Sequence, residues 1–357
     1  MILADGSFSK VDNPADPEAI DALAEWMSQQ GLGEGPLKDV AKISGGTQNI
    51  MLRFTRSGRE YVLRRGPKHL RPRSNTVIMR ETQVLAALAG TEVPHPHLIA
   101  SCDDPDVLGD AVFYLMEPID GFNAGEELPP LHAGDPAVRF RMGLSMADAL
   151  AKLGAVDYLA VGLGDFGKPD GFLERQVPRW LSELESYREF ENYPGPDIPG
   201  VDDVARWLEE GQPPVWTPGI MHGDYHASNV MFSRTGPEVV AIVDWEMCTI
   251  GDPLLDLGWL LATWRPSDAS SAFGGTLFDK GGLASTSDLV EQYGRNTTRD
   301  LSHITWYTVL ACFKLGIVLE GTLARASAGK APKEVGELLH AATVSLFEQA
   351  CELMESA

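Results

Sequence analysis

Apolar and polar residues alternate differently in the two halves of the chain, and the pattern predicts strands early and helices later. Runs rich in β-branched and aromatic residues predict strands over about 39–44, 49–55, 60–65 and 112–116, with Gly45-Gly46 and Ser57-Gly58 as turns. A helical spacing places Ile78, Leu85 and Leu88 on one side of a helix over about 76–89. Before the first strand, Asp16-Pro17-Glu18 opens a helix that Gly31 ends, and we interpret this helix as a structural extension without a catalytic role.

The second half of the chain predicts a mostly helical domain. Asp135-Pro136 caps a long helix whose core stripe is Val138, Met142, Met146, Leu150 and Leu153. Further helices are predicted over about 173–189, 201–210, 302–325 and 333–355. The segment 265–287 is rich in Ser, Gly and Asp, which favours a mobile loop. The Pro and Gly in Glu117-Pro118-Ile119-Asp120-Gly121 mark the best candidate for a domain boundary.

Composition and charge limit the possible partners. The chain has 357 residues, of which 44% are hydrophobic and 22% charged, as expected of an ordered globular protein with about two lobes. Its formal net charge of −22 argues against nucleic acid and acidic membrane surfaces as partners. The same charge is compatible with a cationic substrate, but it also serves solubility, and both interpretations stay open. The oligomeric state is not predictable from the sequence.

Several features favour a cytoplasmic location. The four cysteines are scattered without a Cys-x-x-Cys pair, which suggests neither a zinc site nor a disulfide framework. The first residues lack the basic and apolar segments of a signal peptide. The most apolar long stretch, 304–323, contains Lys314 and Glu320, so we expect a buried helix there rather than a membrane span.

The stretch His222-Gly223-Asp224-Tyr225-His226-Ala227-Ser228-Asn229 carries the clearest chemistry. Gly219-Ile220-Met221 precedes it as a short buried strand, and a second strand, 239–243, leads into Asp244-Trp245-Glu246. Strand ends therefore present two carboxylates and an amide. One acid can accept a proton, and the remaining oxygens suit a hard cation such as Mg²⁺.

These residues resemble the aminoglycoside phosphotransferase family. The resemblance rests on His-Gly-Asp-x-x-x-x-Asn at 222–229, Asp-Trp-Glu at 244–246 and Gly-Asp-Pro-Leu-Leu-Asp-Leu at 251–257. It implies a bilobal protein-kinase-like α+β fold, with a small antiparallel-sheet lobe over 1–118 and a larger helical lobe over 119–357. It further implies transfer of the ATP γ-phosphoryl group to a hydroxyl of a small molecule, with Asp224 as catalytic base and with Asn229 and Asp244 as Mg²⁺ ligands.

The same resemblance assigns roles to residues on both sides of this stretch. Gly45, Gly46 and Thr47 stand where kinases place their glycine-rich loop, and the backbone of Glu117 and Ile119 would bind adenine. Arg64 replaces the usual strand lysine, and Glu81 would pair with it, while Arg65 points to the other face of the strand. His222 is expected to order the loop, and His226 either to order it or to contact the γ-phosphate. Asp256 is expected to accept backbone N–H groups from the loop. Asp252 is expected to cap the helix that begins at Pro253.

The substrate stays open between several alternatives. An aminoglycoside-like polycation suits the acidic composition. However, Arg64 resembles a branch of the family that is fused in some proteins to acyl-CoA dehydrogenases, which suggests hydroxy acids or hydroxyacyl-CoA. Such an acceptor would need a cation, for which Arg179, Arg188 and Arg265 are available. A nucleotide-binding pseudokinase is the alternative of another class. A choice between ATP and GTP, and a role in antibiotic resistance, are not predicted.

Overall fold

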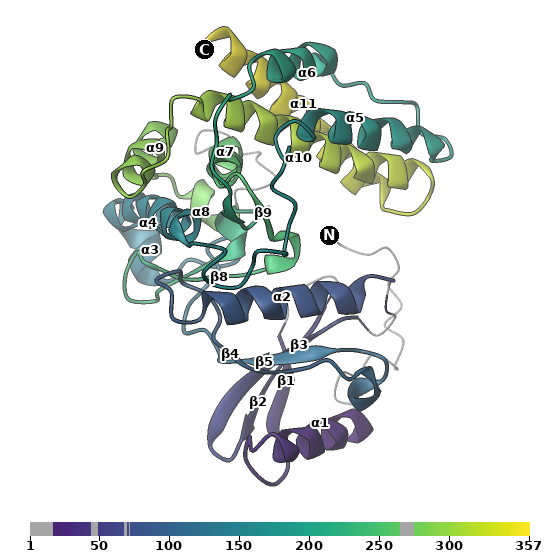
Figure 1. Ribbon diagram of the computed structural model, residues 1–357, viewed down its shortest axis with the longest axis vertical. Coiled ribbons are helices and arrows are strands. Elements are labelled where there is room, and N and C mark those ends of the chain that lie inside the picture. The colour runs from purple at the N-terminus through teal and green to yellow at the C-terminus, as the bar shows by residue number, and fades with distance from the viewer. Residues whose placement is uncertain (1–16, 44–48, 68–69, 71, 265–274) are drawn as a thin grey trace. The chain divides into compact units, whose positions relative to one another are not determined.

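The computed structural model describes residues 17–43, 49–67, 70, 72–264 and 275–357 (Figure 1). Within it the chain forms two compact units. Among the described residues, the N-terminal unit comprises 17–91 together with 95–120, and the C-terminal unit comprises 92–94 and 121–357. Each unit is built around its own core, and the predicted α+β class is confirmed.

The N-terminal unit is a five-stranded antiparallel sheet with the strand order β1-β2-β3-β5-β4. Its strands are β1 (Lys38–Lys42), β2 (Ile50–Arg56), β3 (Arg59–Arg65), β4 (Leu98–Cys102) and β5 (Phe113–Met116). Ser57 and Gly58, both with positive φ, form the two-residue turn predicted between β2 and β3. A short 3-10 turn, Pro105–Leu108, follows β4.

A helix covers each face of this sheet (Figure 1). The helix α1 (Pro17–Gln29) packs on the face that carries Leu63 and Leu115. The helix α2 (Ser74–Leu88) packs against β4 and β5. Because neighbouring residues of a strand point to opposite faces, the side chains of Arg64 and Arg65 lie on opposite faces of the sheet.

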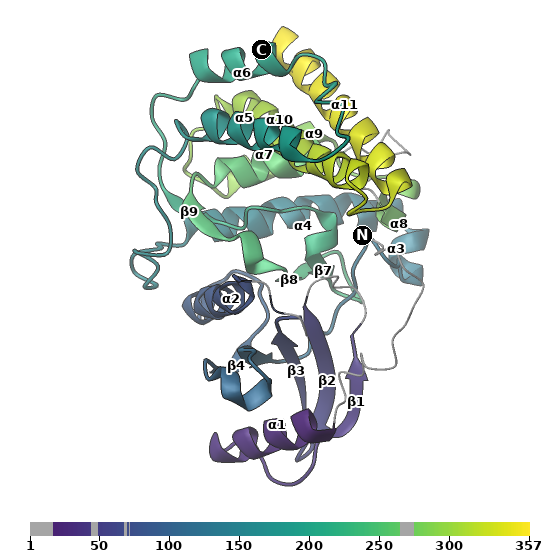
Figure 2. The same ribbon diagram turned by 90° about the vertical axis from the view of Figure 1, so that its right-hand side faces the viewer.

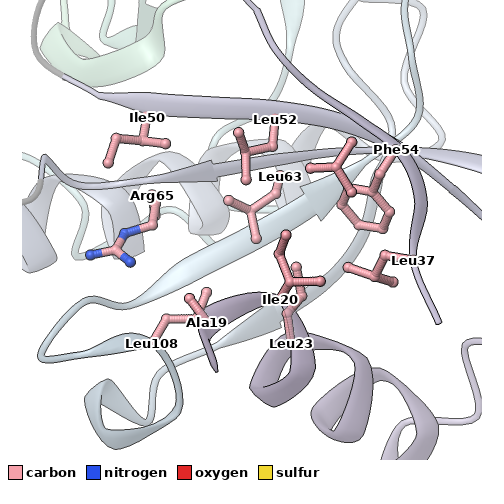
Figure 3. Close-up of a pocket in the computed structure, with 11 residues that line it drawn as sticks. Ala19, Ile20, Leu23, Leu37, Ile50, Leu52, Phe54, Leu63, Arg65 and Leu108 are labelled. Atoms are coloured by element: carbon pink, nitrogen blue, oxygen red, sulfur yellow. The ribbon is translucent and has the colours of Figure 1, made fainter. Parts of the chain in front are cut away.

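Arg65 lines an apolar cavity of about 40 Å³ between the sheet and α1 (Figure 3). Ala19 and Ile20 of α1 and Leu63 of β3 are among the residues around it. Burial lowers the pKa of the Arg65 guanidinium. Arg65 therefore lies on the opposite face from Arg64, as the strand periodicity predicts.

The C-terminal unit is mostly helical and is organised around α10 (Ile304–Ser327), which packs against α5, α6, α7 and α11 (Figure 2). Its other helices are α3 (Pro130–Gly134), α4 (Pro136–Ala155), α5 (Gln176–Ser186), α6 (Val201–Glu210), α7 (Leu254–Thr263), α8 (Gly275–Asp279), α9 (Thr286–Arg295) and α11 (Lys333–Glu355). By length and composition α10 could cross a membrane, but 83% of its most apolar window is buried inside the structure. The prediction of a buried helix is confirmed.

Two short antiparallel ladders lie within this unit. β6 (Gly219–Met221) pairs with β9 (Thr249–Gly251), and β7 (Val230–Phe232) pairs with β8 (Val239–Ile242). 3-10 turns at Ala227–Asn229 and Trp245–Met247 follow the ends of β6 and β8. The predicted strand ends therefore exist, and they carry the motif residues.

Two predictions of local structure were wrong. The segment 265–287 was expected to be a loop, but its described part contains α8 and the start of α9, where Ser285 and Asp288 form a reciprocal cap. We missed this capping box because its residues merge into a Ser-rich composition. β4 was also not predicted, because Leu-Ile-Ala-Ser-Cys is too short and mixed for a clear period-2 signal.

Candidate active site

Hydrogen bonds to buried groups hold the loop that follows β6. The His222 side chain is fully buried, and its Nε2 lies 2.9 Å from the carbonyl oxygen of Val243. The backbone N–H groups of His222 and Gly223 donate to the two carboxylate oxygens of Asp256, at 2.5 and 2.9 Å. Both predicted contacts are present. These hydrogen bonds fix the backbone of the two residues that precede Asp224.

Gly223 is required at its position by backbone conformation and by space. Its φ is +87°, a region that side-chain-bearing residues rarely adopt. A Cβ atom there would lie 2.5 Å from the carbonyl oxygen of Met247. The close approach packs the loop that follows β6 directly onto the turn that follows Asp244.

Asp224 lies among polar and cationic groups. His226 Nε2 is 3.6 Å from its Oδ1, and Asn229 Nδ2 is 3.1 Å from its Oδ2. Burial raises the pKa of Asp224, but the hydrogen bond and charge of His226, followed by the charges of His222 and Lys314, lower it to about 2. Asp224 is therefore a carboxylate at neutral pH and can accept a hydrogen bond or a proton.

The orientation of the Asn229 amide follows from its partners. Its Nδ2 donates both to the backbone carbonyl of Asp224, at 2.9 Å, and to the Asp224 carboxylate. Both partners are acceptors, so the nitrogen must face them and Oδ1 must point elsewhere. The Val243 N–H donates to the Asn229 carbonyl oxygen at 2.9 Å, which places Asn229 beside the strand that ends at Asp244.

Asp244 has a left-handed backbone conformation, with φ 65° and ψ 61°. This conformation is energetically unfavourable for non-glycine residues, and it is found disproportionately at functional sites. It turns the chain sharply at the end of β8. Asn229 Oδ1 and the Asp244 carboxylate are hard oxygen donors of the kind that Mg²⁺ prefers, so the residues present fit this cation.

His226 contributes to the order of the loop. Its Nδ1 accepts the N–H of Ser228 at 3.2 Å, which caps the 3-10 turn Ala227–Asn229. Its other ring nitrogen faces Asp224. The predicted structural role in the loop is therefore present, combined with an electrostatic effect on the acid.

Asp252 and Asp256 tie α7 to its surroundings. Asp252 accepts the N–H of Leu254 at 3.1 Å, as the capping prediction requires, and also the hydroxyl of Tyr307 in α10. Burial raises the pKa of both carboxyls, although the Tyr307 hydrogen bond acts against this at Asp252, and His222 with two backbone N–H groups acts against it at Asp256.

The N-terminal unit contains the predicted ion pair. Arg64 of β3 and Glu81 of α2 are 2.8 Å apart, and the Glu81 side chain is only 1% exposed. The register pairs Arg64 with Tyr114 of β5, and the Tyr114 hydroxyl donates to Glu81 at 2.9 Å. Glu81 is thus a buried carboxylate held by a cation and a hydroxyl on the same sheet face.

The remaining predicted nucleotide-binding residues are less fully described. The N–H of Glu117 donates to the carbonyl oxygen of His97 at 2.9 Å, and its side chain pairs with Arg59 at 2.8 Å. Ile119 makes no backbone hydrogen bond to any other described residue. Gly45, Gly46 and Thr47 lie outside the described residues.

Sequence reasoning missed Lys314 as a site residue. It is 7% exposed in the middle of α10, and its ammonium donates to the carbonyl of Gly223 at 3.2 Å. The available signal was a single lysine in an apolar stretch, which we had used only as an argument against a membrane span. The sequence offered Arg179 as a possible cation for the acceptor, but it gave no sign that Arg179 packs against Trp180.

A family model described as the phosphotransferase enzyme family matches residues 39–289. Among curated proteins, acyl-CoA dehydrogenase family member 10 of Mus musculus is 28% identical over 338 residues, and family member 11 of Gallus gallus is 29% identical over 323 residues. These matches cover 92% and 88% of this chain, but the chain spans only 30% and 40% of the length of those relatives.

Solved structures share the fold. A candidate aminoglycoside phosphotransferase from Ralstonia eutropha is 29% identical with a TM-score of 0.78, and the match covers 93% of this chain and 98% of that one. An aminoglycoside phosphotransferase in complex with GDP and kanamycin is 16% identical, with a TM-score of 0.60 and coverage of 93% and 99%. An aminoglycoside phosphotransferase mutant with ADP and hygromycin B is 12% identical, with a TM-score of 0.57 and coverage of 93% and 98%. At these low identities the last two show the fold alone.

Proposed function

Because the chain belongs to the phosphotransferase enzyme family, we propose that it transfers the γ-phosphoryl group of ATP to a hydroxyl group of a small molecule. The observation that carries the proposal is the arrangement around Asp224. Its carboxylate is ionised and held in place by Asn229 and His226, and its loop is fixed by Asp256. This arrangement suits a base that must receive a substrate hydroxyl at a defined position.

In the proposed reaction the acceptor oxygen forms a bond to the γ-phosphorus while the bond to the β,γ-bridging oxygen breaks, and ADP leaves. The hydroxyl proton passes to Asp224. A pKa of about 2 makes Asp224 a weak base. A weak base is sufficient because the transition state of phosphoryl transfer is loose and the acceptor proton is released late. Orientation of the hydroxyl is then the larger contribution of Asp224.

Asn229 and Asp244 would hold Mg²⁺ in this proposal, and the cation would supply neutralisation of phosphate charge. In the N-terminal unit Arg64 would bind phosphate oxygens, since a guanidinium is permanently charged and bidentate. Glu81 and Tyr114 would fix the orientation of Arg64 through the contacts described above.

For the acceptor we favour a hydroxy compound that carries an anionic group, such as a hydroxy acid or a hydroxyacyl-CoA. Two cations contact the same indole: Arg179 Cζ lies 5.0 Å and Lys314 Nζ 5.6 Å from the Trp180 ring. Arg179 is exposed, and among the described residues it has no carboxylate within ion-pair distance. Arg179 acts electrostatically on Lys314, and Lys314 bonds to the residue before Asp224. Positive charge on this side of the loop suits an anion better than a polycationic aminoglycoside. The acyl-CoA dehydrogenase family members among the relatives support the same choice.

The reaction is tested with Asp224→Asn, which keeps the shape of the side chain and removes the base. We expect ADP formation with Mg²⁺-ATP and an acceptor panel to fall by roughly 10²–10⁴-fold. Asp165→Asn, on an exposed turn, serves as the matched control and should be unaffected. Equal rates for wild type and Asp224→Asn would refute the assignment of Asp224. Binding of Mg²⁺-ATP without turnover on any acceptor would instead favour the pseudokinase.

The acceptor class is tested with hydroxyacyl-CoA, simple hydroxy acids and kanamycin. We expect Arg179→Gln to raise the KM for the anionic acceptor roughly 10-fold, the size of a lost charge-assisted hydrogen bond, without changing the KM for ATP. Arg188→Gln is the matched control, because Arg188 is exposed and pairs with Glu185. Faster turnover of kanamycin, insensitive to Arg179→Gln, would overturn the anionic acceptor and restore the aminoglycoside-like one.

A further inference from the structure

Lys314 is a buried cation under the catalytic loop. It lies in a helix whose neighbouring positions are apolar, among them the fully buried Leu310, Phe313 and Ile317. Transfer of an ammonium group from water into such surroundings is costly unless polar partners compensate. The partners of Lys314 therefore indicate why a lysine is tolerated there.

The ammonium group has three kinds of partner. Its Nζ lies 4.5 Å from the Trp259 ring and 5.6 Å from the Trp180 ring, in cation–π geometry. It donates a hydrogen bond of 3.2 Å to the Gly223 carbonyl. Of the charged groups around it, Asp256 of α7 and Asp224 of the loop favour the ammonium, and Arg179 of α5 opposes it. The side chain is thus directed at the loop by contacts from three separate elements.

The peptide group between Gly223 and Asp224 is held at both ends. Its carbonyl accepts from Lys314, and its N–H, which belongs to Asp224, points to His222 Nδ1 at 3.3 Å. The preceding peptide group donates its N–H to Asp256. Lys314 is the contact that comes from α10, and it acts on the residue immediately before the proposed base.

We propose that Lys314 is a positioning residue for phosphoryl transfer, which holds the Gly223 carbonyl so that the Asp224 carboxylate stays at the acceptor. This inference rests on the proposed function for its catalytic consequence, but the ordering of the loop can be measured without turnover. Burial lowers the pKa of Lys314, although the Asp256 and Asp224 carboxylates act against this.

The test compares Lys314→Met, which removes the charge at similar volume, with Lys314→Arg, which keeps it. Lys330→Met is the control, since Lys330 is an exposed lysine that also makes a cation–π contact, to Phe190 at 5.2 Å. We expect Lys314→Met to lower kcat by roughly 10–100-fold, as for a lost hydrogen bond to a charged donor, with little change in the KM for ATP. Its melting temperature should change little, because removal of the buried charge offsets the loss of its attraction to Asp256 and Asp224.

Two further readouts separate positioning from simple packing. Amide hydrogen exchange of the segment 219–232 should increase in Lys314→Met while the rest of the chain keeps its protection. In wild type, kcat should fall at alkaline pH as Lys314 loses its proton, below the usual lysine value of 10.5. Lys314→Arg should regain part of the activity and lose this alkaline limb, because arginine stays charged.

A parallel loss of kcat and melting temperature in Lys314→Met, or unchanged exchange in 219–232, would overturn the proposal. If wild type turns over no acceptor, the proposed function fails by itself. In that case the exchange and melting measurements still decide whether Lys314 positions the loop.

Discussion

Each carboxylate oxygen of Asp256 accepts one backbone N–H group of the candidate site. Replacement of either oxygen should therefore disturb the loop. Asp256→Asn keeps one acceptor oxygen and places an NH₂ group against either His222 or Gly223, which already donate. We expect kcat to fall roughly 10-fold or more through displacement of the loop. Steady-state kinetics checks this, and a kcat equal to that of wild type would contradict it.

The stability of Asp256→Asn relative to wild type should depend on pH in a definite direction. Burial raises the folded-state pKa of Asp256 above its ordinary 3.8. The folded protein therefore binds the Asp256 proton more tightly than the unfolded chain does. This contribution to the free energy of unfolding is fully present below pH 3.8 and is lost as the pH rises through the folded-state pKa. Asparagine has no such loss, so the stability of Asp256→Asn relative to wild type should improve as the pH rises above 3.8. Denaturant unfolding at several pH values measures this difference.

Arg64 and Arg65 are neighbours with opposite surroundings, which makes them a matched pair. Arg64→Met leaves the buried Glu81 without its cation, although Tyr114 still donates to it. We expect a loss of about 3 kcal/mol in the free energy of unfolding, the lower end for a broken buried ion pair. Arg65→Met, beside the apolar cavity, should cost much less. Urea unfolding of both variants is the measurement, and equal losses would contradict the assignment.

Single residues were predictable where their partners follow from local periodicity. Arg64 and Glu81 could be paired because strand and helix periods set their faces, and the contacts of Asp256 follow from the motif it belongs to. Lys314 could not be assigned, because its partner Gly223 is 91 positions away in sequence and the contact depends on where α10 crosses the loop. No pattern along the chain encodes that crossing.

At the scale of elements, α7 and α10 meet at an unusually close backbone contact. A Cβ atom on Gly258 would lie 2.4 Å from the Tyr307 carbonyl oxygen, which is backbone and cannot give way as a side chain could. We expect Gly258→Ala to cost about 2 kcal/mol or more by separating the helices, and also to reduce kcat, because α7 carries Asp256. Gly134→Ala, which meets nothing within 4 Å, is the control and should be neutral. Urea unfolding and kinetics of both variants check this, and a stable, active Gly258→Ala would contradict it.

Helices and strands were predicted most accurately where the sequence marks both of their ends clearly. α6 and α11 begin and end at the predicted residues, because each has a strong apolar stripe between clear breaks. β4 was missed because it is a short strand of mixed residues, and α9 because it begins in a Ser-rich stretch whose composition favoured a loop. Segments held by tertiary packing therefore needed the structure.

At the scale of the whole molecule, net charge and local charge point in different directions. The chain carries a formal charge of −22, which is compatible with a cationic substrate but also serves solubility. Around Trp180, however, the structure brings two cations together. Composition averages over the surface, whereas recognition depends on the few groups near the reacting atom. The sequence could therefore predict the phosphotransferase family, but it left the charge of the proposed acceptor open.

The net charge has its own testable consequence for stability. Excess negative charge repels itself more in the compact state than in the unfolded chain. Raising the ionic strength from 0.01 to 0.15 M shortens the screening length from about 30 to about 8 Å. Exposed pairs such as Arg53–Glu60 and Arg295–Glu291 weaken as well, but such pairs contribute at most about 1 kcal/mol each. We therefore expect a net rise in melting temperature of roughly 2 °C or more.

Differential scanning calorimetry in sodium chloride, potassium chloride and choline chloride at matched ionic strength measures this rise. Similar increases in all three salts indicate screening, because a site specific for one cation would respond to that salt alone. A fall in melting temperature in every salt would contradict the prediction. It would mean that attractive pairs, and not the repulsion among 51 acidic side chains, dominate the surface energy of the folded chain.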